Sequence, residues 1–176
     1  MLPSDLHIRS AEASDLLEIG ALFDRARQSL KEQGVDQWQD GYPFPEDLEE
    51  DVTRDRAYVL LSGGRVVGYF AYVSGKDRVY EEISEGAFRE SGKYAAVHRV
   101  AVSPELRGNG VGSCIFDYAV KLAHIDLAVS LRCDTHEDNK PMRSLLAKCG
   151  FQYCGVVYYE RKDGHRDKRI AFDRLL

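Results

Sequence analysis

The sequence predicts an α/β fold with a mixed central sheet. Runs rich in β-branched and aromatic residues alternate along the chain with other runs. In these other runs the apolar residues recur every three or four positions, as in amphipathic helices. The last two predicted strands are separated only by a short turn, so part of the sheet is expected to be antiparallel. The 176 residues show no repeat, linker or low-complexity tract, and they suit a single domain over residues 1–176.

Each expected element rests on its own local signal. The first long helix begins near Ser14 and ends at Gly34, and the pair Gly63-Gly64 marks a hairpin turn. Residues 78–88 are ambiguous and favour a helical turn or two. The whole pattern predicts about seven strands and about four helices. The first three are a strand at 6–9 and helices at 14–34 and 48–52. Strands follow at 57–61, 65–73 and 94–102, then a helix at 110–124, a strand at 128–133 and a helix at 139–148. The last two are strands at 151–160 and 168–173, joined at 162–164.

Composition excludes several classes of function. The formal net charge of -5 argues against a protein that binds nucleic acid or an anionic membrane, since such proteins present a basic face. No apolar run approaches the roughly 18 residues of a membrane span, and the N-terminus lacks the features of a secretion signal. We therefore expect a cytoplasmic protein. Its four cysteines should be reduced structural thiols, and their spacing predicts no metal site.

The clearest chemical signal is a glycine-rich segment between a predicted strand and a predicted helix. Its glycines let several backbone N–H groups turn toward one point, and a helix N-terminus favours negative charge there. Its arginine can bond phosphate oxygens. The segment therefore predicts a pyrophosphate site, with the candidate residues Arg107, Gly108, Asn109, Gly110, Val111, Gly112 and Ser113.

Other glycine-rich motifs fit this segment less well. A P-loop needs Lys-Ser or Lys-Thr after its last glycine, whereas Gly112 is followed by Ser113-Cys114. A dinucleotide-binding fingerprint has a different glycine spacing, although Asp134 does follow the next predicted strand, where such a site has its acid. A turn without any ligand is the remaining alternative.

The segment resembles the acetyl-CoA-binding motif of the GNAT acetyltransferases, Arg/Gln-x-x-Gly-x-Gly/Ala, which is filled here by Arg107, Gly110 and Gly112. A second resemblance lies downstream, where residues 139–151 are similar to the fourth helix of that family and end in Gly150-Phe151. The opening segment, Ile8-Arg9-x-Ala11, also looks like a GNAT first strand. The resemblance thus extends over nearly the whole chain.

This resemblance implies a fold, a co-substrate and a set of binding residues. The fourth strand of GNAT proteins splays from its neighbour, and its backbone pairs with the pantetheine arm of acetyl-CoA. The matching residues here are Val100, Ala101 and Val102. Asn139 matches the residue that commonly contacts the cofactor arm. Many GNAT proteins pair through edge strands, so a homodimer is also an expectation.

His98 is the leading candidate for the base that deprotonates the acceptor amine. It precedes Val100 by two positions, which in a regular strand would place both side chains on one face. An imidazole ordinarily titrates near pH ~6.5, which suits a base at neutral pH. Arylalkylamine acetyltransferases carry a histidine at the matching position. The alternative for His98 is a histidine that only packs or bonds locally.

One position departs from the family pattern. GNAT proteins often have a tyrosine four residues before the Gly-Phe glycine, where it protonates the departing thiolate, whereas this sequence has Leu146. Three tyrosines of the last predicted hairpin could replace it, and the sequence does not choose among Tyr153, Tyr158 and Tyr159.

The acceptor side is expected between the first two helices. Trp38 and Tyr42 lie there, and they are the candidate substrate-binding residues because an aromatic wall can bind a cationic amine. Packing in the core is the alternative for Trp38. The predicted function is transfer of an acetyl group from acetyl-CoA to a primary amine of a small molecule, amino acid or peptide. A non-catalytic acyl-CoA-binding module is the alternative, and Leu146 is its main support.

Overall fold

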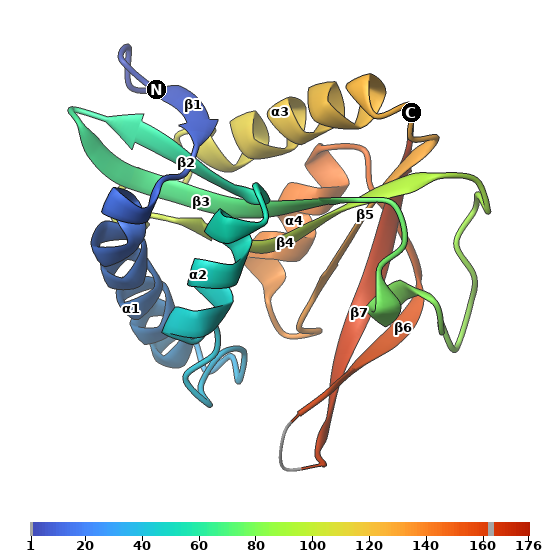
Figure 1. The fold of residues 1–176 in the computed structure, drawn as a ribbon. Helices are drawn as coiled ribbons and strands as arrows, with labels where there is room; N and C mark the ends of the chain where they lie inside the picture. The colour runs from blue at the N-terminus through green and yellow to red at the C-terminus, as the bar shows by residue number, and fades with distance from the viewer. Residues whose placement is uncertain (1, 162–163) are drawn as a thin grey trace. The chain divides into compact units, whose positions relative to one another are not determined.

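The computed structural model describes residues 2–161 and 164–176 and has the predicted mixed sheet (Figure 1). Within these residues the sheet has 7 strands in the order β1-β2-β3-β4-β5-β7-β6. The strands are β1 (His7–Ser10), β2 (Ala57–Ser62), β3 (Arg65–Ser74), β4 (Tyr94–Val102), β5 (Ser130–Thr135), β6 (Gln152–Glu160) and β7 (Arg166–Leu175). The α-helices are α1 (Leu16–Glu32), α2 (Pro45–Thr53), α3 (Val111–Ile125) and α4 (Lys140–Lys148), and short 3-10 turns are η1 (Ala13–Asp15), η2 (Arg78–Tyr80) and η3 (Pro104–Leu106). The α/β prediction is confirmed.

The strand registers show which part of the sheet is parallel. β4 and β5 run parallel, whereas β1 with β2, β2 with β3, β5 with β7 and β6 with β7 are antiparallel. A dinucleotide-binding fold rests on a mostly parallel sheet built from βαβ units, so this mixed topology disfavours that alternative.

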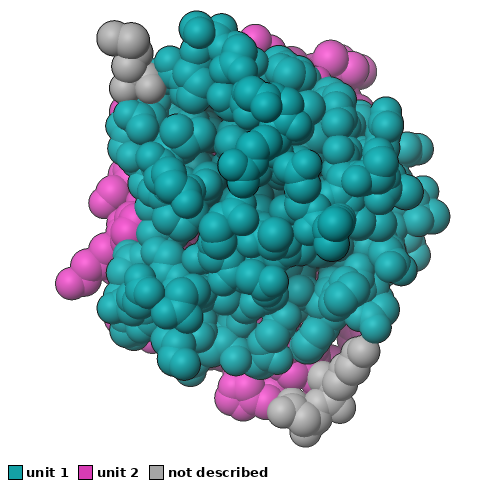
Figure 2. Space-filling model, turned by 90° about the vertical axis from the view of Figure 1, so that its left-hand side faces the viewer, with its two compact units in different colours: residues 1–72, 98–115 teal, residues 73–97, 116–176 magenta. Residues whose placement is uncertain are grey.

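The chain divides into two compact units, which Figure 2 distinguishes by colour. Unit 1 contains residues 1–72 and 98–115, and unit 2 contains residues 73–97 and 116–176. The division passes through β4 between Val97 and His98, and through α3 between Ile115 and Phe116. The glycine-rich segment, His98, Trp38 and Tyr42 therefore all belong to unit 1, whereas Asn139 belongs to unit 2.

The core of unit 1 is formed by the apolar stripe of α1 against the first three strands. Figure 1 shows α1 and α2 on the same side of β2 and β3. Phe23, fully buried on α1, contacts Trp38 and Tyr69 edge-on, with ring centroids 5.3 Å apart in both pairs. Arg9 and Asp15 fix the start of α1 through two hydrogen bonds of 2.7 and 2.8 Å. Edge-on aromatic pairs, such as those that Phe23 forms with Trp38 and Tyr69, stabilise a core by more than their buried apolar area alone would.

Unit 2 is held together by buried polar contacts as well as apolar packing. The guanidinium of Arg132 lies between two aromatic rings, 3.8 Å from the centroid of Phe88 and 3.6 Å from that of Tyr94. Asp173 is buried in β7 and accepts hydrogen bonds from the backbone and the side chain of Arg89. These contacts attach residues 88–94 to the sheet, because a desolvated cation or carboxylate needs a partner.

Several segments differ from the prediction in detail. Helix α2 begins at Pro45 rather than at residue 48, and β5 is Ser130–Thr135 rather than 128–133. Residues 78–88 form only the short turn η2, because Asp77 caps it and Ser84 then forms a bridge with Val156. The final strand begins at Arg166, earlier than expected. Residues 162 and 163 of the predicted turn lie outside the described residues. Among the described helices, none is long and apolar enough to cross a membrane.

Two glycine-to-alanine variants should have opposite effects on stability. A Cβ at position 86 would lie 1.9 Å from the carbonyl oxygen of Cys154, so backbone has to move in Gly86→Ala. We expect a loss of about 1–3 kcal/mol in the free energy of unfolding, as for other overpacked sites. Gly20 lies inside α1 with no atom within 4 Å of the added Cβ, so Gly20→Ala should gain about 1 kcal/mol. Urea unfolding followed by circular dichroism measures both, and equal midpoints for the two variants would contradict the expectation.

Candidate functional site

Strand β4 carries the backbone feature that defines the site. Its parallel register with β5 joins Tyr94–Val97 to Ser130–Cys133, and β4 then continues to Val102. Arg99, in this continuation, has a φ of 53°, in the left-handed region. A left-handed residue interrupts the alternation of a strand and changes the direction of the peptide groups beside it. The regular alternation that would place His98 and Val100 on one face is therefore broken between them.

A buried ion pair holds Arg99 in this conformation. Its Nε donates to Oδ2 of Asp51 at 2.7 Å and its Nη2 donates to Oδ1 at 2.5 Å, so the pair is bidentate. The Asp51 carboxylate comes from α2 and is 3% exposed, and the Arg99 side chain is 16% exposed. Bidentate pairing fixes both the position and the plane of the guanidinium.

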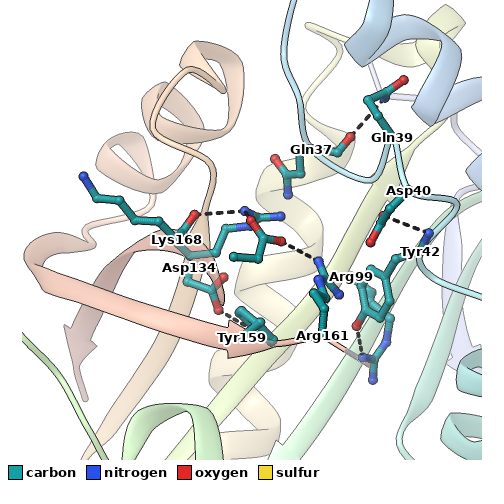
Figure 3. A network of polar contacts seen from close by, with 11 residues as sticks. Gln37, Gln39, Asp40, Tyr42, Arg99, Asp134, Tyr159, Arg161 and Lys168 are labelled. Atoms are coloured by element: carbon teal, nitrogen blue, oxygen red, sulfur yellow. Dashed lines mark hydrogen bonds and ion pairs between the residues drawn. The ribbon is translucent and has the colours of Figure 1, made fainter. Parts of the chain in front are cut away.

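Two tyrosines complete this network. Nη1 of Arg99 donates to the hydroxyl oxygen of Tyr42 at 2.6 Å, a hydrogen bond drawn in Figure 3. The hydroxyl of Tyr69, on β3, donates to Oδ2 of Asp51 at 2.7 Å. The network thus joins β4 to α2, to β3 and to the segment between α1 and α2. We call Tyr42, Asp51, Tyr69 and Arg99 the β4 network.

The charges of the β4 network follow from burial and from the ion pair. Burial by itself lowers the pKa of the Arg99 guanidinium, but Tyr42 and Asp51 hold it well above its ordinary value. Burial raises the pKa of the Tyr42 phenol, an effect that Arg99 partly offsets. Burial also raises the pKa of Tyr69, and the nearby Asp51 charge adds to it. Both phenols are therefore protonated at neutral pH, and the cation of Arg99 persists.

The glycine-rich segment forms a turn that leads into α3. Gly108 and Gly110 have φ values of 78° and 88°, which residues with a side chain rarely adopt. A Cβ at Gly108 would meet no atom within 4 Å, so the backbone there is open to a ligand. The N–H of Cys114 bonds to the carbonyl of Gly110 at 3.1 Å, which leaves the preceding N–H groups at the helix start without an intrahelical partner. The arrangement fits an anionic group.

Arg107 stands at the entrance to this turn and is exposed. Its Nη1 donates to Oγ of Ser29 on α1, which fixes one end of the guanidinium. The other N–H groups of the Arg107 guanidinium can donate hydrogen bonds to a phosphate oxygen. Asn109 and Gly110 are half-buried, as are Gly112 and Ser113, and Val111 is buried. The predicted residues therefore lie in the turn at 107–110 and in the first turn of α3 at 111–113.

The other predicted residues have distinct surroundings. In β4, Val100 and Ala101 are buried, and His98 and Val102 are partly exposed. Trp38 is 8% exposed and packs edge-on against Phe23, so its ring lies in the core of unit 1. Its substrate-binding role stays a prediction, and the structure provides direct support only for the packing alternative.

Asn139 lies in unit 2 as the N-cap of α4. Its Oδ1 accepts a hydrogen bond from the backbone N–H of Met142 at 3.1 Å, and the residue is 7% exposed. A cap of this kind satisfies a donor at the helix start. The contact of Asn139 with a cofactor arm stays a prediction.

Sequence reasoning missed a second tyrosine–carboxylate cluster, in unit 2. The hydroxyls of Tyr80 and Tyr159 each donate to Oδ1 of Asp134 at 2.7 Å, and Figure 3 shows the bond from Tyr159. Leu146 is 0% exposed, which suits its apolar side chain. Of the three tyrosines left open above, Tyr153 is exposed, and Tyr158 has the guanidinium of Arg166 4.5 Å from its ring centroid.

Sequence reasoning also missed Asp51 and Arg99. Asp51 belongs to a run of acidic residues on a short helix, which normally indicates a solvated face. No sequence signal marks a left-handed arginine inside a strand, since that conformation is mainly a property of glycine and asparagine. Among the described residues, no group of three or more His, Cys, Asp or Glu side chains could hold a metal ion.

Comparison with known proteins agrees with this geometry. The model of the Acetyltransferase (GNAT) family matches residues 23–151, and the chain belongs to this family. The match includes the glycine-rich segment, all of β4 and the turn after α4.

Individual relatives support the same family. A solved GNAT acetyltransferase from Streptococcus agalactiae is 32% identical, with a TM-score of 0.82, covering 100% of this chain and 98% of that one. A solved protein provisionally named a phosphinothricin N-acetyltransferase is 25% identical, with a TM-score of 0.69 and coverage of 98% and 99%. Streptothricin acetyltransferase of Escherichia coli is 32% identical over 68 residues, which is 39% of this chain and 39% of the relative.

The cysteines should differ sharply in their reactivity. Cys154 is buried, and burial together with Asp173 raises the pKa of its thiol to about 11. Cys114 is partly exposed. At pH ~8 we expect iodoacetamide to modify Cys154 at least about 100-fold more slowly than Cys114, because the thiolate is the reactive form. Peptide mass spectrometry over time gives both rates, with urea-unfolded protein as the control. Equal rates in the folded protein would contradict this assignment.

Proposed function

We propose that this protein is an acetyl-CoA-dependent N-acetyltransferase that acts on a primary amine of a small molecule, amino acid or peptide. Membership of the GNAT family is the observation that carries the proposal. The names of two relatives, streptothricin acetyltransferase and a provisional phosphinothricin N-acetyltransferase, favour a small-molecule acceptor. The proposed setting is the cytoplasm, without nucleic-acid or membrane partners, and the protein is proposed to form a homodimer.

The pyrophosphate of acetyl-CoA would bind at the start of α3. The open backbone at Gly108, the N–H groups of the first helical turn and the Arg107 guanidinium supply donors and positive charge. The pantetheine arm would pair with the backbone of Val100, Ala101 and Val102. Asn139 is proposed to contact the same arm.

Acetyl transfer would proceed by direct attack. The amine nitrogen forms a bond to the thioester carbonyl carbon, its proton passes to His98, and the C–S bond breaks to release the thiolate of CoA. A backbone N–H near Val100 would stabilise the oxyanion, as preformed donors do in other acyl transfers. An acetyl intermediate on Cys154 is not favoured, because burial raises the pKa of that thiol and keeps it protonated.

The leaving thiolate needs less assistance than an alkoxide or an amide would. A thiol with a pKa near ~8.5 is about 1.5 units above neutral pH, which corresponds to roughly 2 kcal/mol. Leu146 is therefore compatible with turnover. Tyr42 is proposed to line the acceptor side directly. Trp38 is proposed to contribute to that side indirectly, because its ring packs in the core and fixes the segment that carries Tyr42.

Calorimetric titration tests the co-substrate. We expect acetyl-CoA to bind with a micromolar Kd, and Arg107→Ala to weaken binding about 10-fold because one charge-assisted contact with phosphate is lost. NAD should give no heat. Arg56→Ala, which changes another arginine of unit 1, serves as the matched control and should keep the wild-type Kd. Absence of acetyl-CoA binding to the wild-type protein would refute the proposed function.

His98→Ala tests the proposed base. With an amine panel and a thiol-release assay, the variant should lose about 100- to 10,000-fold in kcat and keep its affinity for acetyl-CoA, as expected for removal of a general base. The exposed His124, near the end of α3, provides the control His124→Ala, which should leave kcat unchanged. Unchanged kcat in His98→Ala would remove His98 from the mechanism. Slow CoA release with every amine by the wild type would favour the non-catalytic module.

A further inference from the structure

Arg99 lies between His98, the proposed base, and Val100, near which the oxyanion donor is proposed. Arg99 directly follows His98 and directly precedes Val100 in β4, and it is left-handed, with a φ of 53°. Of the five left-handed non-glycine residues in the described chain, it is the one inside a strand. A left-handed backbone is unfavourable for any residue that has a Cβ, so surrounding contacts must stabilise this conformation of Arg99.

The contacts of the Arg99 side chain satisfy each nitrogen of its guanidinium. All three guanidinium nitrogens of Arg99 donate within 2.7 Å or less, two to Asp51 and one to Tyr42. Tyr69 in turn bonds to Asp51 at 2.7 Å. The partners come from α2, β3 and the segment between α1 and α2, so three separate elements fix one residue of β4.

We propose that Arg99 is a positioning residue for acetyl transfer, held by Asp51. By fixing the left-handed backbone, the ion pair sets the direction of the peptide groups between His98 and Val100. It thereby aims the N–H that stabilises the oxyanion, and it orients the imidazole that accepts the amine proton. Arg99 itself does not touch the reacting atoms. This proposal rests on the proposed function.

A second consequence concerns the acceptor. The Tyr42 hydroxyl is bonded to the same guanidinium, so a residue proposed to line the acceptor side is connected through one side chain to the backbone at position 99. Misplacement of Arg99 should therefore affect kcat more than the Kd of acetyl-CoA, because the charged contacts proposed at the Arg107 loop add to the affinity that the pairing with β4 supplies.

The test compares glycine with alanine at position 99. Asp51→Asn/Arg99→Gly and Asp51→Asn/Arg99→Ala both lose the ion pair, and the Asp51→Asn change avoids a buried charge without a partner. Glycine adopts a φ of 53° freely, whereas alanine does not. We expect the glycine variant to exceed the alanine variant about 5- to 30-fold in kcat, with acetyl-CoA Kd values within about 3-fold of wild type. Glu50→Gln changes the exposed carboxylate next to Asp51 on α2, outside the β4 network, and it should keep the wild-type kcat.

Activity is measured per folded molecule, well below the melting midpoint of each variant, so that lost stability alone does not lower kcat. Equal kcat for the glycine and alanine variants, or wild-type kcat in the alanine variant, would overturn the proposal. The backbone amide NMR shifts of His98 and Val100, corrected for the residue type at position 99, give a readout that needs no turnover. They should stay near wild type in the glycine variant and move in the alanine variant. Identical shifts in both variants would also overturn it. Failure of the wild type to acetylate any amine would instead refute the proposed function.

Discussion

The buried ion pair between Arg99 and Asp51 is the constraint on which unit 1 depends. A guanidinium that is largely withdrawn from water is unfavourable unless every charge and donor has a partner. Here the bidentate carboxylate and the Tyr42 hydroxyl supply those partners at 2.5 to 2.7 Å. The same contacts stabilise the left-handed conformation of Arg99 in β4. They therefore offset both the cost of this backbone conformation and the cost of burying the guanidinium.

This constraint explains why several elements of unit 1 meet at one place. Helix α2 is short and strongly acidic, yet Asp51 is its buried acid, because Arg99 is the cation that it faces. Tyr69 is fully buried among apolar neighbours and needs an acceptor for its hydroxyl, which the Asp51 carboxylate provides. Trp38 then anchors the chain that carries Tyr42, through its contact with Phe23. Removal of the Asp51 carboxylate would take this acceptor away from both the Arg99 guanidinium and the Tyr69 hydroxyl.

Unit 2 also contains charged side chains withdrawn from water, but their partners are of a different kind. Its carboxylate Asp134 accepts two phenol hydroxyls, and its cation Arg132 lies between aromatic rings. Phenol hydroxyls and aromatic ring faces stabilise a charge without a full ion pair. Asn139 adds the N-cap that fixes the start of α4. Each unit therefore uses buried polar contacts where the sheet alone would leave its loops unattached.

The sequence by itself determined the order of strands and helices, the α/β class and the glycine-rich segment. These features are local, since a repeat of two or of three to four residues and a run of glycines can be recognised without knowing distant contacts. It also carried the resemblance to the family that the comparisons confirm, whereas the roles of His98 and Arg107 stay predictions. Tertiary structure alone decided that Trp38 packs in the core, that Asp51 is buried, and that Arg99 is left-handed. Each of these depends on residues far apart in the chain, and their pairing is set by packing and desolvation rather than by local pattern.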